Sequence, residues 1–335
     1  MTQIPDKPFK SFPELVSLLE NTHKLKISDP ETAEKILSLI PYYDLINGYK
    51  DLFMDNNDEY ISSVTFEDLY LFHIFDKGFQ GTIFPFSNII ENYFKNVLAY
   101  VIAKDFGVCE KSYLHKSNYI GNIQKRYYSD IQSSIEKVYN DTRIDEPTAY
   151  YLAHHNHIPP WILLKNVTFS RAINLFEFLK PAQRIQVCDM LIPASIPQNQ
   201  KYQLLLYVLT VIRKCRNTIA HNLKFTSFSV SQYNKHLPHR ALRTFISPKL
   251  LSWEEIRKEK NIDDIYAYIM FSLSLIPDSA VKLFFLQQLI DYLTANSLRY
   301  TESSAPNLAN LYIKKLNFPP DIVSRLQNYR NSVSK

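Results

Sequence analysis

An arginine and a histidine near the end of one predicted helix form the pattern with the clearest chemical potential. Arg216 precedes His221 by five positions, and Asn217 lies between them. Histidine can exchange a proton near neutral pH, and arginine can hold an anion through paired N–H donors. The same pair also suits a basic helix end, where cations offset the helix dipole. The two residues are therefore a candidate site that needs further support.

Helix geometry limits how these side chains can cooperate. On an ideal helix Arg216 and His221 are about 140° apart and roughly 7–8 Å apart along the axis, so they do not touch. Arg216 falls at the edge of the apolar arc, where a charge needs a partner or a wet groove. Asn217 and His221 are i, i+4 neighbours and can meet directly. A shared site would need the long reach of arginine, a distorted helix end or a second chain.

Helical periodicity extends through most of the sequence and predicts the elements that position this pair. Apolar residues repeat at spacings of three and four over 87–106 and 201–221, which indicates two long helices. Further helices are expected at 123–139 and 161–179, with a turn at 154–160. Two more are expected between 262 and 295, separated at Ile276-Pro277-Asp278. The stretch 226–248 is rich in Ser, His and Pro and predicts a loop or boundary. Phe225 to Val230 could also form a short strand.

Composition excludes several classes of protein. The 335 residues contain only 5 glycines, and no glycine-rich nucleotide-binding motif occurs, which argues against P-loop, dinucleotide-binding and all-β folds. The net charge of +5 permits an anionic partner without requiring one. Cys109, Cys188 and Cys215 are odd in number and far apart, as expected for reduced thiols. Without an apolar signal segment or a spanning helix, a cytoplasmic bacterial protein with no membrane partner is expected.

Four segments together resemble a known family. Arg216 to His221 is similar to the R-x(4–6)-H motif of HEPN domains, which are helical bundles that include many ribonucleases. Three other segments resemble the Abi-like (AbiD/AbiF-type) abortive-infection proteins over about residues 7–225. They are Lys7-Pro8 with Leu39-Ile40-Pro41-Tyr42-Tyr43 and Asn47-Gly48-Tyr49, then Asn88-Ile89-Ile90-Glu91-Asn92-Tyr93-Phe94-Lys95, and Ile158-Pro159-Pro160-Trp161-Ile162-Leu163-Leu164 leading into Thr168-Phe169.

This resemblance implies an endoribonuclease that needs no metal or other cofactor. His221 would take the proton of the RNA 2′-hydroxyl or protonate the departing 5′-oxygen, and Arg216 would stabilise charge on the phosphate. Asn217 would orient His221 or contact the phosphate. The expected products are a 2′,3′-cyclic phosphate and a 5′-hydroxyl. Because HEPN sites typically form between two domains and this chain has one motif, a homodimer is implied.

The resemblance also suggests supporting residues. Glu91 would face Arg216 and position its guanidinium, although a solvated role is the alternative. Family members often carry arginine where Lys95 stands, and lysine would bind phosphate less well in two-pronged fashion. Arg213 and Lys214 would steer RNA, or would simply form a solvated face.

Other polar and aromatic groups have competing interpretations. His154-His155-Asn156-His157 invites a zinc site, but no cysteine or acidic cluster with ligand spacing is nearby, so a polar turn or an RNA contact is favoured. Tyr42, Tyr43 and Tyr49 could stack on bases, although aromatic residues at this density usually form core.

The combined hypothesis is an all-α protein with a HEPN-type bundle at 65–230, an N-terminal helical extension at 1–64 and a C-terminal helical extension at 231–335. It would cleave RNA in anti-phage defence or a toxin–antitoxin pair, with a small RNA as a possible inhibitor and no DNA partner. Two alternatives stay open. One is a non-catalytic module that holds a structured small RNA in the same Arg/His groove, and the other is a helical scaffold.

Overall fold

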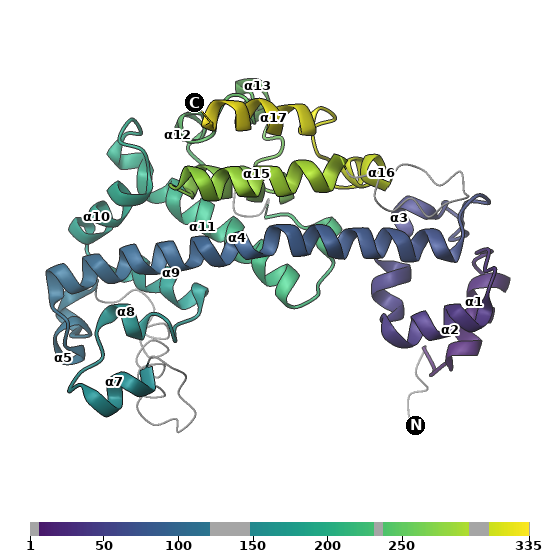
Figure 1. Cartoon of the computed structure of the whole chain (residues 1–335), viewed down its shortest axis with the longest axis horizontal. Helices are drawn as coiled ribbons and strands as arrows, with labels where there is room; N and C mark the ends of the chain where they lie inside the picture. The colour runs from purple at the N-terminus through teal and green to yellow at the C-terminus, as the bar shows by residue number, and fades with distance from the viewer. Residues whose placement is uncertain (1–6, 121–147, 231–236, 295–307, 335) are drawn as a thin grey trace, which may run out of the picture. The chain divides into compact units, whose positions relative to one another are not determined.

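The chain is helical throughout the part that the computed structural model describes, residues 7–120, 148–230, 237–294 and 308–334 (Figure 1). Within these ranges no extended strand occurs. Isolated β-bridges join Lys26 to Thr65, Met54 to Tyr60 and Tyr119 to Leu179. These observations confirm the predicted all-α class. The HEPN-type arrangement of the helices stays a prediction.

The described residues form two compact units. Unit 1 is drawn from residues 1–82, 222–227 and 291–320, and unit 2 from residues 83–221, 228–290 and 321–335. The chain passes from unit 1 to unit 2 within the long helix α4 (Phe66–Phe106). The remaining helices of unit 1 are α1 (Phe12–Asn21), α2 (Pro30–Leu39), the π-helix η1 (Tyr43–Asn47), α3 (Lys50–Phe53), the 3-10 turn η3 (Phe225–Ser227) and α16 (Leu308–Lys315). Those of unit 2 are α5 (Glu110–Tyr113), η2 (Lys116–Asn118), α7 (Thr148–His154), α8 (Pro160–Leu163), α9 (Phe169–Phe178), α10 (Pro181–Leu191), α11 (Gln198–Ala220), α12 (His239–Phe245), α13 (Trp253–Arg257), α14 (Ile265–Leu275), most of α15 (Ser279–Thr294) and α17 (Ile322–Val333).

Helix α4 is longer than the sequence pattern indicates. The sequence predicts a helix from residue 87 and a separate helix that begins at residues 65–68, but the structure joins the two into one helix through Pro85. Proline removes one backbone donor inside a helix and crowds the preceding turn, so it normally marks a break. Here apolar residues on both sides of Pro85 are buried, including Ile83 and Phe86, and their burial favours a continuous helix.

Unit 1 is built around an aromatic core on the first half of α4. The rings of Phe72, Phe75 and Phe79 lie 5.1–5.7 Å from the ring of Tyr312 on α16. Tyr292, in the last turns of α15, contacts both Phe75 and Phe79 and donates its hydroxyl to the Phe75 carbonyl at 2.7 Å. Such tilted and edge-on pairs add to the free energy of apolar burial. Unit 1 thus joins residues that are far apart in the chain.

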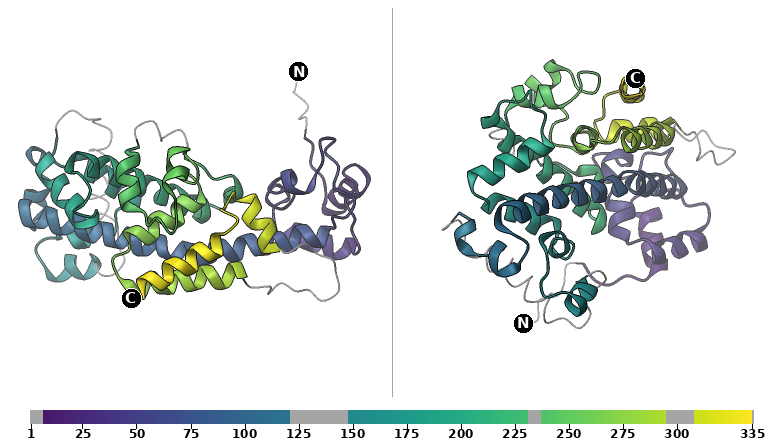
Figure 2. Two further views of the ribbon diagram at one scale, coloured as in Figure 1. Left: turned by 90° about the horizontal axis from the view of Figure 1, so that it is seen from above. Right: turned by 60° about the vertical axis from the view of Figure 1, so that its left-hand side comes forward.

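Unit 2 is organised around α11, which packs against α14, α10, α9 and α12. Both views of Figure 2 show the teal and green helices of unit 2 beside the second half of α4. Helix α14 is buried almost all round, and Tyr268 from its centre donates its hydroxyl to the Ile83 carbonyl at 2.7 Å. The core therefore holds α11 rigidly along most of its length.

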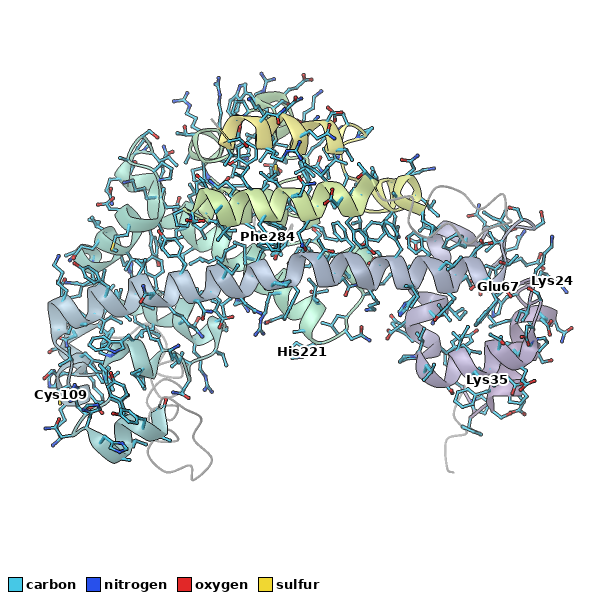
Figure 3. The ribbon with its side chains drawn as sticks, viewed as in Figure 1. Lys24, Lys35, Glu67, Cys109, His221 and Phe284 are labelled. Carbon is cyan, nitrogen blue, oxygen red and sulfur yellow. The ribbon has the colours of Figure 1, made fainter. Side chains whose placement is uncertain are left out.

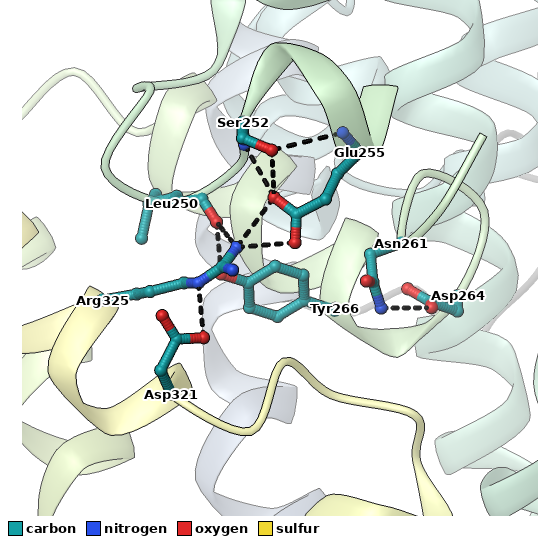
Figure 4. A network of polar contacts seen from close by, with 8 residues as sticks. All are labelled: Leu250, Ser252, Glu255, Asn261, Asp264, Tyr266, Asp321 and Arg325. Carbon is teal, nitrogen blue, oxygen red and sulfur yellow. Dashed lines mark hydrogen bonds and ion pairs between the residues drawn. The ribbon is translucent and has the colours of Figure 1, made fainter. Parts of the chain in front are cut away.

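A polar network attaches α17 to the rest of unit 2 (Figure 4). The guanidinium of Arg325 donates to Glu255 at 2.9 Å and 3.0 Å, to the Leu250 carbonyl at 3.1 Å and to Asp321 at 2.8 Å. Glu255 also accepts from Ser252 in the capping box that begins α13. A single nitrogen, Nη1 of Arg325, contacts both carboxylate oxygens of Glu255, and both side chains are half-buried.

Several predicted boundaries need correction. The helix expected over 161–179 is two helices, α8 and α9, because Thr168 caps a new helix by accepting from the Arg171 N–H. The expected loop at 226–248 contains helix α12, whose apolar residues Ala241, Leu242 and Phe245 are buried. The alternative strand at Phe225 to Val230 begins instead with η3. The helix predicted at 123–139 lies outside the described residues. The helix at 201–221 and the break at Ile276–Asp278 are confirmed.

Candidate active site

The second half of α4 and the end of α11 bring Glu91 and Arg216 together in unit 2. The Oε2 atom of Glu91 lies 3.9 Å from the Nε atom of Arg216. The Glu91 side chain is only 12% exposed and that of Arg216 is 31% exposed. At this separation the two groups attract as charges without forming a hydrogen bond. The carboxylate therefore biases the position of the guanidinium without saturating its donors.

Glu91 has a second and closer cationic partner. Lys95, one turn further along α4, places its Nζ atom 2.6 Å from Glu91 Oε1, with 11% of its side chain exposed. An i, i+4 pair of this order is favourable on a helix. Lys95 is therefore engaged by Glu91 rather than projecting into solvent as a phosphate ligand.

Arg216 keeps an unsatisfied donor. Its Nη1 atom donates to the side-chain oxygen of Asn217 at 3.2 Å, and its guanidinium lies 5.9 Å from the centre of the Phe84 ring. Its Nε atom is buried and has no hydrogen-bond partner among the described residues. A buried N–H without a hydrogen-bond partner is costly, and the charge of the nearby Glu91 carboxylate offsets part of that cost.

His221 occupies the C-cap of α11 and is exposed. Its backbone N–H donates to the Asn217 carbonyl at 3.0 Å, which closes the last helical turn. Figure 3 shows the labelled His221 projecting outward at the end of this helix. Within the described part of the chain its side chain has no hydrogen-bond partner. The imidazole is accessible to a substrate, and the local fold does not orient it.

Asn217 does not make the contact with His221 that one of its two predicted roles, orienting His221, would require. Its side-chain oxygen accepts from Arg216, and no side-chain contact with His221 occurs among the described residues. An i, i+4 spacing permits such a contact but does not require it, because Asn217 lies next to a stronger donor. In this structure Asn217 positions the guanidinium.

The two other predicted basic residues take different places on α11. Arg213 and Lys214 are both half-buried. Arg213 lines a groove with Glu177 of α9, and the carbonyl of Lys214 accepts the hydroxyl of Thr218 at 3.0 Å. Arg213 therefore lies on the surface that leads along α11 toward Asn217.

Comparison with known families matches residues 35–226 to the family described as Abi-like protein. This range covers more than half of the 335 residues and includes all seven site residues predicted from the sequence. The chain belongs to the Abi-like protein family. Membership implies a role in abortive-infection phage defence. No curated protein and no solved structure matches the chain.

The Abi-like chain also has a buried polar cluster in unit 1 that sequence reasoning missed. Asp76 is 3% exposed and accepts hydrogen bonds from Tyr49, Gln80 and Tyr312 at 2.9, 2.9 and 2.6 Å. Burial raises the pKa of the Asp76 carboxyl, although the hydrogen bonds from these three donors act to lower it. Burial, together with Lys77, lowers the pKa of His73 to about 4. In the sequence, this cluster could have been detected from three polar residues, His73, Asp76 and Gln80, spaced along one side of an otherwise apolar helix.

This cluster is suited to holding unit 1 together rather than to binding a substrate. Lys77 donates to the Asn222 side chain, which in turn donates to Asp44 at 3.0 Å. The cavity beside these residues has a volume of about 20 Å³, which is room for roughly one water molecule. Asn222 has φ of 52°, the left-handed conformation that commonly follows a helix end.

The tyrosine and histidine candidates from the sequence take both buried and exposed positions. Tyr49 is core, Tyr42 is half-buried and Tyr43 is 62% exposed. His154 contacts the Tyr150 carbonyl at 2.9 Å and stacks on the Tyr150 ring, so it belongs to the end of α7.

No group of three or more histidine, cysteine, aspartate or glutamate side chains in the described ranges could hold a metal ion. The three cysteines are free thiols, two of them buried. Among the described residues no helix is both long and apolar enough to cross a membrane.

Proposed function

We propose that this Abi-like protein is a HEPN-type endoribonuclease that acts in abortive infection without a metal ion. The observation that supports this most directly is the placement of Arg216, which lies beside Glu91 with 31% of its side chain exposed, near the end of a helix capped by an exposed histidine. The exposed part of such a guanidinium can donate to a phosphate oxygen, and an accessible imidazole can exchange a proton with the RNA.

The reaction follows from these groups. His221 removes the proton of the 2′-hydroxyl, the 2′-oxygen attacks phosphorus, and the bond from phosphorus to the 5′-oxygen breaks. Arg216 stabilises the charge on the non-bridging oxygens, while Asn217 and Glu91 hold its guanidinium in place. A second imidazole protonates the departing 5′-oxygen. The products are a 2′,3′-cyclic phosphate and a 5′-hydroxyl.

A second copy of the chain would supply that imidazole. Each chain contains one Arg216 and one His221, and His221 makes no side-chain hydrogen bond in the described part of its own chain. In a symmetric dimer the two motifs would face each other, with one His221 as base and the other as acid. A chain with this activity must be restrained in an uninfected cell, and an RNA inhibitor bound in the same groove would do so.

Expression in bacteria tests the activity. Loss of the base should reduce RNA decay by about 100-fold or more, so His221→Ala should abolish growth arrest. His115→Ala is the matched control, since His115 is also an exposed histidine of unit 2 and lies outside the site. If the His221→Ala protein arrests growth as the wild type does, the proposed enzyme is wrong.

The same variants separate the enzyme from a non-catalytic RNA-binding module. An enzyme retains RNA affinity in His221→Ala while it loses cleavage. A binding module cleaves nothing in either form, and Arg216→Ala removes its affinity. The accessible, unoriented His221 is the feature that keeps this second function in consideration.

A further inference from the structure

A groove in unit 2 lies along the same helix as the candidate active site. Its volume is about 410 Å³, and α9 and α11 form most of its walls. This volume falls within the range of small-molecule sites, roughly 300–1,000 Å³. Ile173, Leu206, Tyr207 and Leu237 provide apolar surface, whereas Asn174, Glu177, Gln203, Thr210 and Arg213 are polar. Apolar walls with a few polar groups suit a flat heterocycle with hydrogen-bonding edges.

The groove continues the face of α11 that carries Asn217 and His221. Gln203, Leu206, Thr210 and Arg213 line it, and on an ideal helix all four lie within about 40° of the direction of Asn217. His221 lies within the same arc. Along the axis Arg213 is roughly 12 Å from His221. Arg216 lies about 100° from this direction, on the side of α11 that faces Glu91. An RNA strand with a phosphate at His221 would therefore reach the groove within a few nucleotides.

A carboxylate in this groove is unexpected for a surface that binds RNA. Glu177 and Arg213 both line it. Partial desolvation raises the pKa of the Glu177 carboxyl, and Arg184 and Arg213 oppose that shift. A negative charge beside a phosphate chain weakens binding unless it accepts hydrogen bonds from the ligand. Glu177 therefore indicates that the ligand presents N–H donors.

We propose that this groove binds a guanine base of the RNA substrate, close to the cleaved phosphate. The proposal rests on the ribonuclease function proposed above. Guanine presents two adjacent donors, N1–H and the N2 amino group, which suit the Glu177 carboxylate. It also presents O6 and N7, the acceptors that arginine contacts most often, which suit Arg213. Adenine would place a lone pair at N1 against the carboxylate. Uracil offers a single N–H donor on its corresponding edge, one fewer than guanine.

A bound base would also contact the apolar residues that lie between the polar ones in the groove. Leu206 is half-buried and Tyr207 is buried, with its hydroxyl donating to the Ile262 carbonyl at 2.9 Å. This hydroxyl is therefore occupied, and only apolar surface is left to face a base. Unpaired bases are commonly recognised by contact with such surfaces together with hydrogen bonds to their edges.

Binding of short RNAs to the His221→Ala chain tests the proposal without cleavage. The probes are a labelled uridine 12-mer, the same strand with one central guanosine, and matched strands with inosine or adenosine at that position. Guanosine should bind about 10-fold or more tightly than uridine or adenosine, and inosine should lose much of this advantage because it lacks the N2 amino group. Adding Glu177→Gln should remove the preference for guanosine and leave the affinity for the uridine strand equal or higher.

Glu254→Gln is the matched control, because Glu254 is an exposed carboxylate of unit 2 whose loss changes the net charge equally. It should leave the preference for guanosine unchanged. Equal affinity for all four strands, or a preference that survives Glu177→Gln, overturns the proposal. If the wild-type chain cleaves RNA but guanosine gives no tighter binding, only the assignment of guanine to the groove is wrong. A guanosine preference without cleavage refutes only the ribonuclease.

Discussion

Glu91 Oε2 and Arg216 Nε are 3.9 Å apart, close enough for charge attraction but too far for a hydrogen bond. This spacing holds the guanidinium near α4 and leaves its Nε donor unsatisfied. The separation is therefore consistent with a guanidinium that is positioned in advance and still able to bind an anion.

Replacing Glu91 should slow RNA cleavage without weakening RNA binding. In Glu91→Gln the carboxylate no longer attracts Arg216, and a misplaced guanidinium should lower the cleavage rate about 10- to 100-fold. RNA affinity should stay equal or rise, because a negative charge is lost beside the phosphate. Cleavage rates and titrations of the same oligonucleotide measure both.

Glu254→Gln is the control for this prediction, since Glu254 forms an exposed i, i+4 pair with Lys258 at 2.6 Å. It should change neither quantity. A fall in RNA affinity that accounts for the whole loss of cleavage in Glu91→Gln would contradict a positioning role.

The Glu91–Lys95 pair should contribute to stability far more than an exposed pair does. Lys95→Met leaves Glu91 buried with only the distant Arg216, and should lower the free energy of unfolding by about 2–4 kcal/mol. Lys35→Met removes the equivalent i, i+4 partner of Glu31, where both side chains are at least 70% exposed, and should cost at most about 0.5 kcal/mol. Urea denaturation of both variants gives the comparison. Equal losses would show that burial does not matter at Lys95.

Two glycines of α4 should respond in opposite directions to the same substitution. A Cβ at Gly78 would overlap the Tyr292 hydroxyl, which is held by its hydrogen bond to the Phe75 carbonyl. Gly78→Ala should therefore destabilise unit 1 by about 1–3 kcal/mol. A Cβ at Gly81 meets no atom within 4 Å, so Gly81→Ala should stabilise the helix by about 0.5–1 kcal/mol. Thermal melting measures both, and a stabilising Gly78→Ala would refute the close approach.

The N-cap of α14 should be more stable as an amide than as a carboxylate at neutral pH. Burial raises the pKa of Asp264 from 3.8 to about 6, although its side chain accepts the Ala267 N–H. Above pH 6 the folded chain must hold this charge in a poorly solvated place. Asp264→Asn should therefore raise the free energy of unfolding by about 1–3 kcal/mol at pH 7.5.

This gain should shrink as pH falls through 6 and vanish below about 4, where Asp264 is protonated in both states. Asp29→Asn is the control, because Asp29 caps α2 at an exposed position and hydrogen bonds with Thr32 lower the pKa of its carboxyl. It should give no gain at pH 7.5. A gain for Asp264→Asn that does not depend on pH would contradict the pKa shift.

Local patterns were sufficient to predict the all-α class, α11 and the family. Spacing along one helix specifies which residues share a face, so Asn217 and His221 could be placed on the same side of α11 from the sequence. The helix break at Pro277 also depends only on neighbouring residues.

The features that were missed depend on contacts between distant segments. Helix α4 continues through Pro85 because burial on both sides outweighs a lost backbone bond. The Asp76 cluster needs Tyr312, which is 236 positions away in the chain. The groove exists only where α9 packs against α11, so Glu177 carried no signal in the sequence alone.

The most direct test of the account is the treatment of total RNA with purified wild-type and His221→Ala protein in EDTA, with both fragment ends mapped. The account predicts that only the wild type cleaves, and that it leaves 2′,3′-cyclic phosphates and 5′-hydroxyls. Adding an excess of His221→Ala subunits to the wild type should abolish the activity if each site needs an imidazole from both chains. Equal cleavage by His221→Ala, or fragments with 5′-phosphates, would contradict the proposed mechanism.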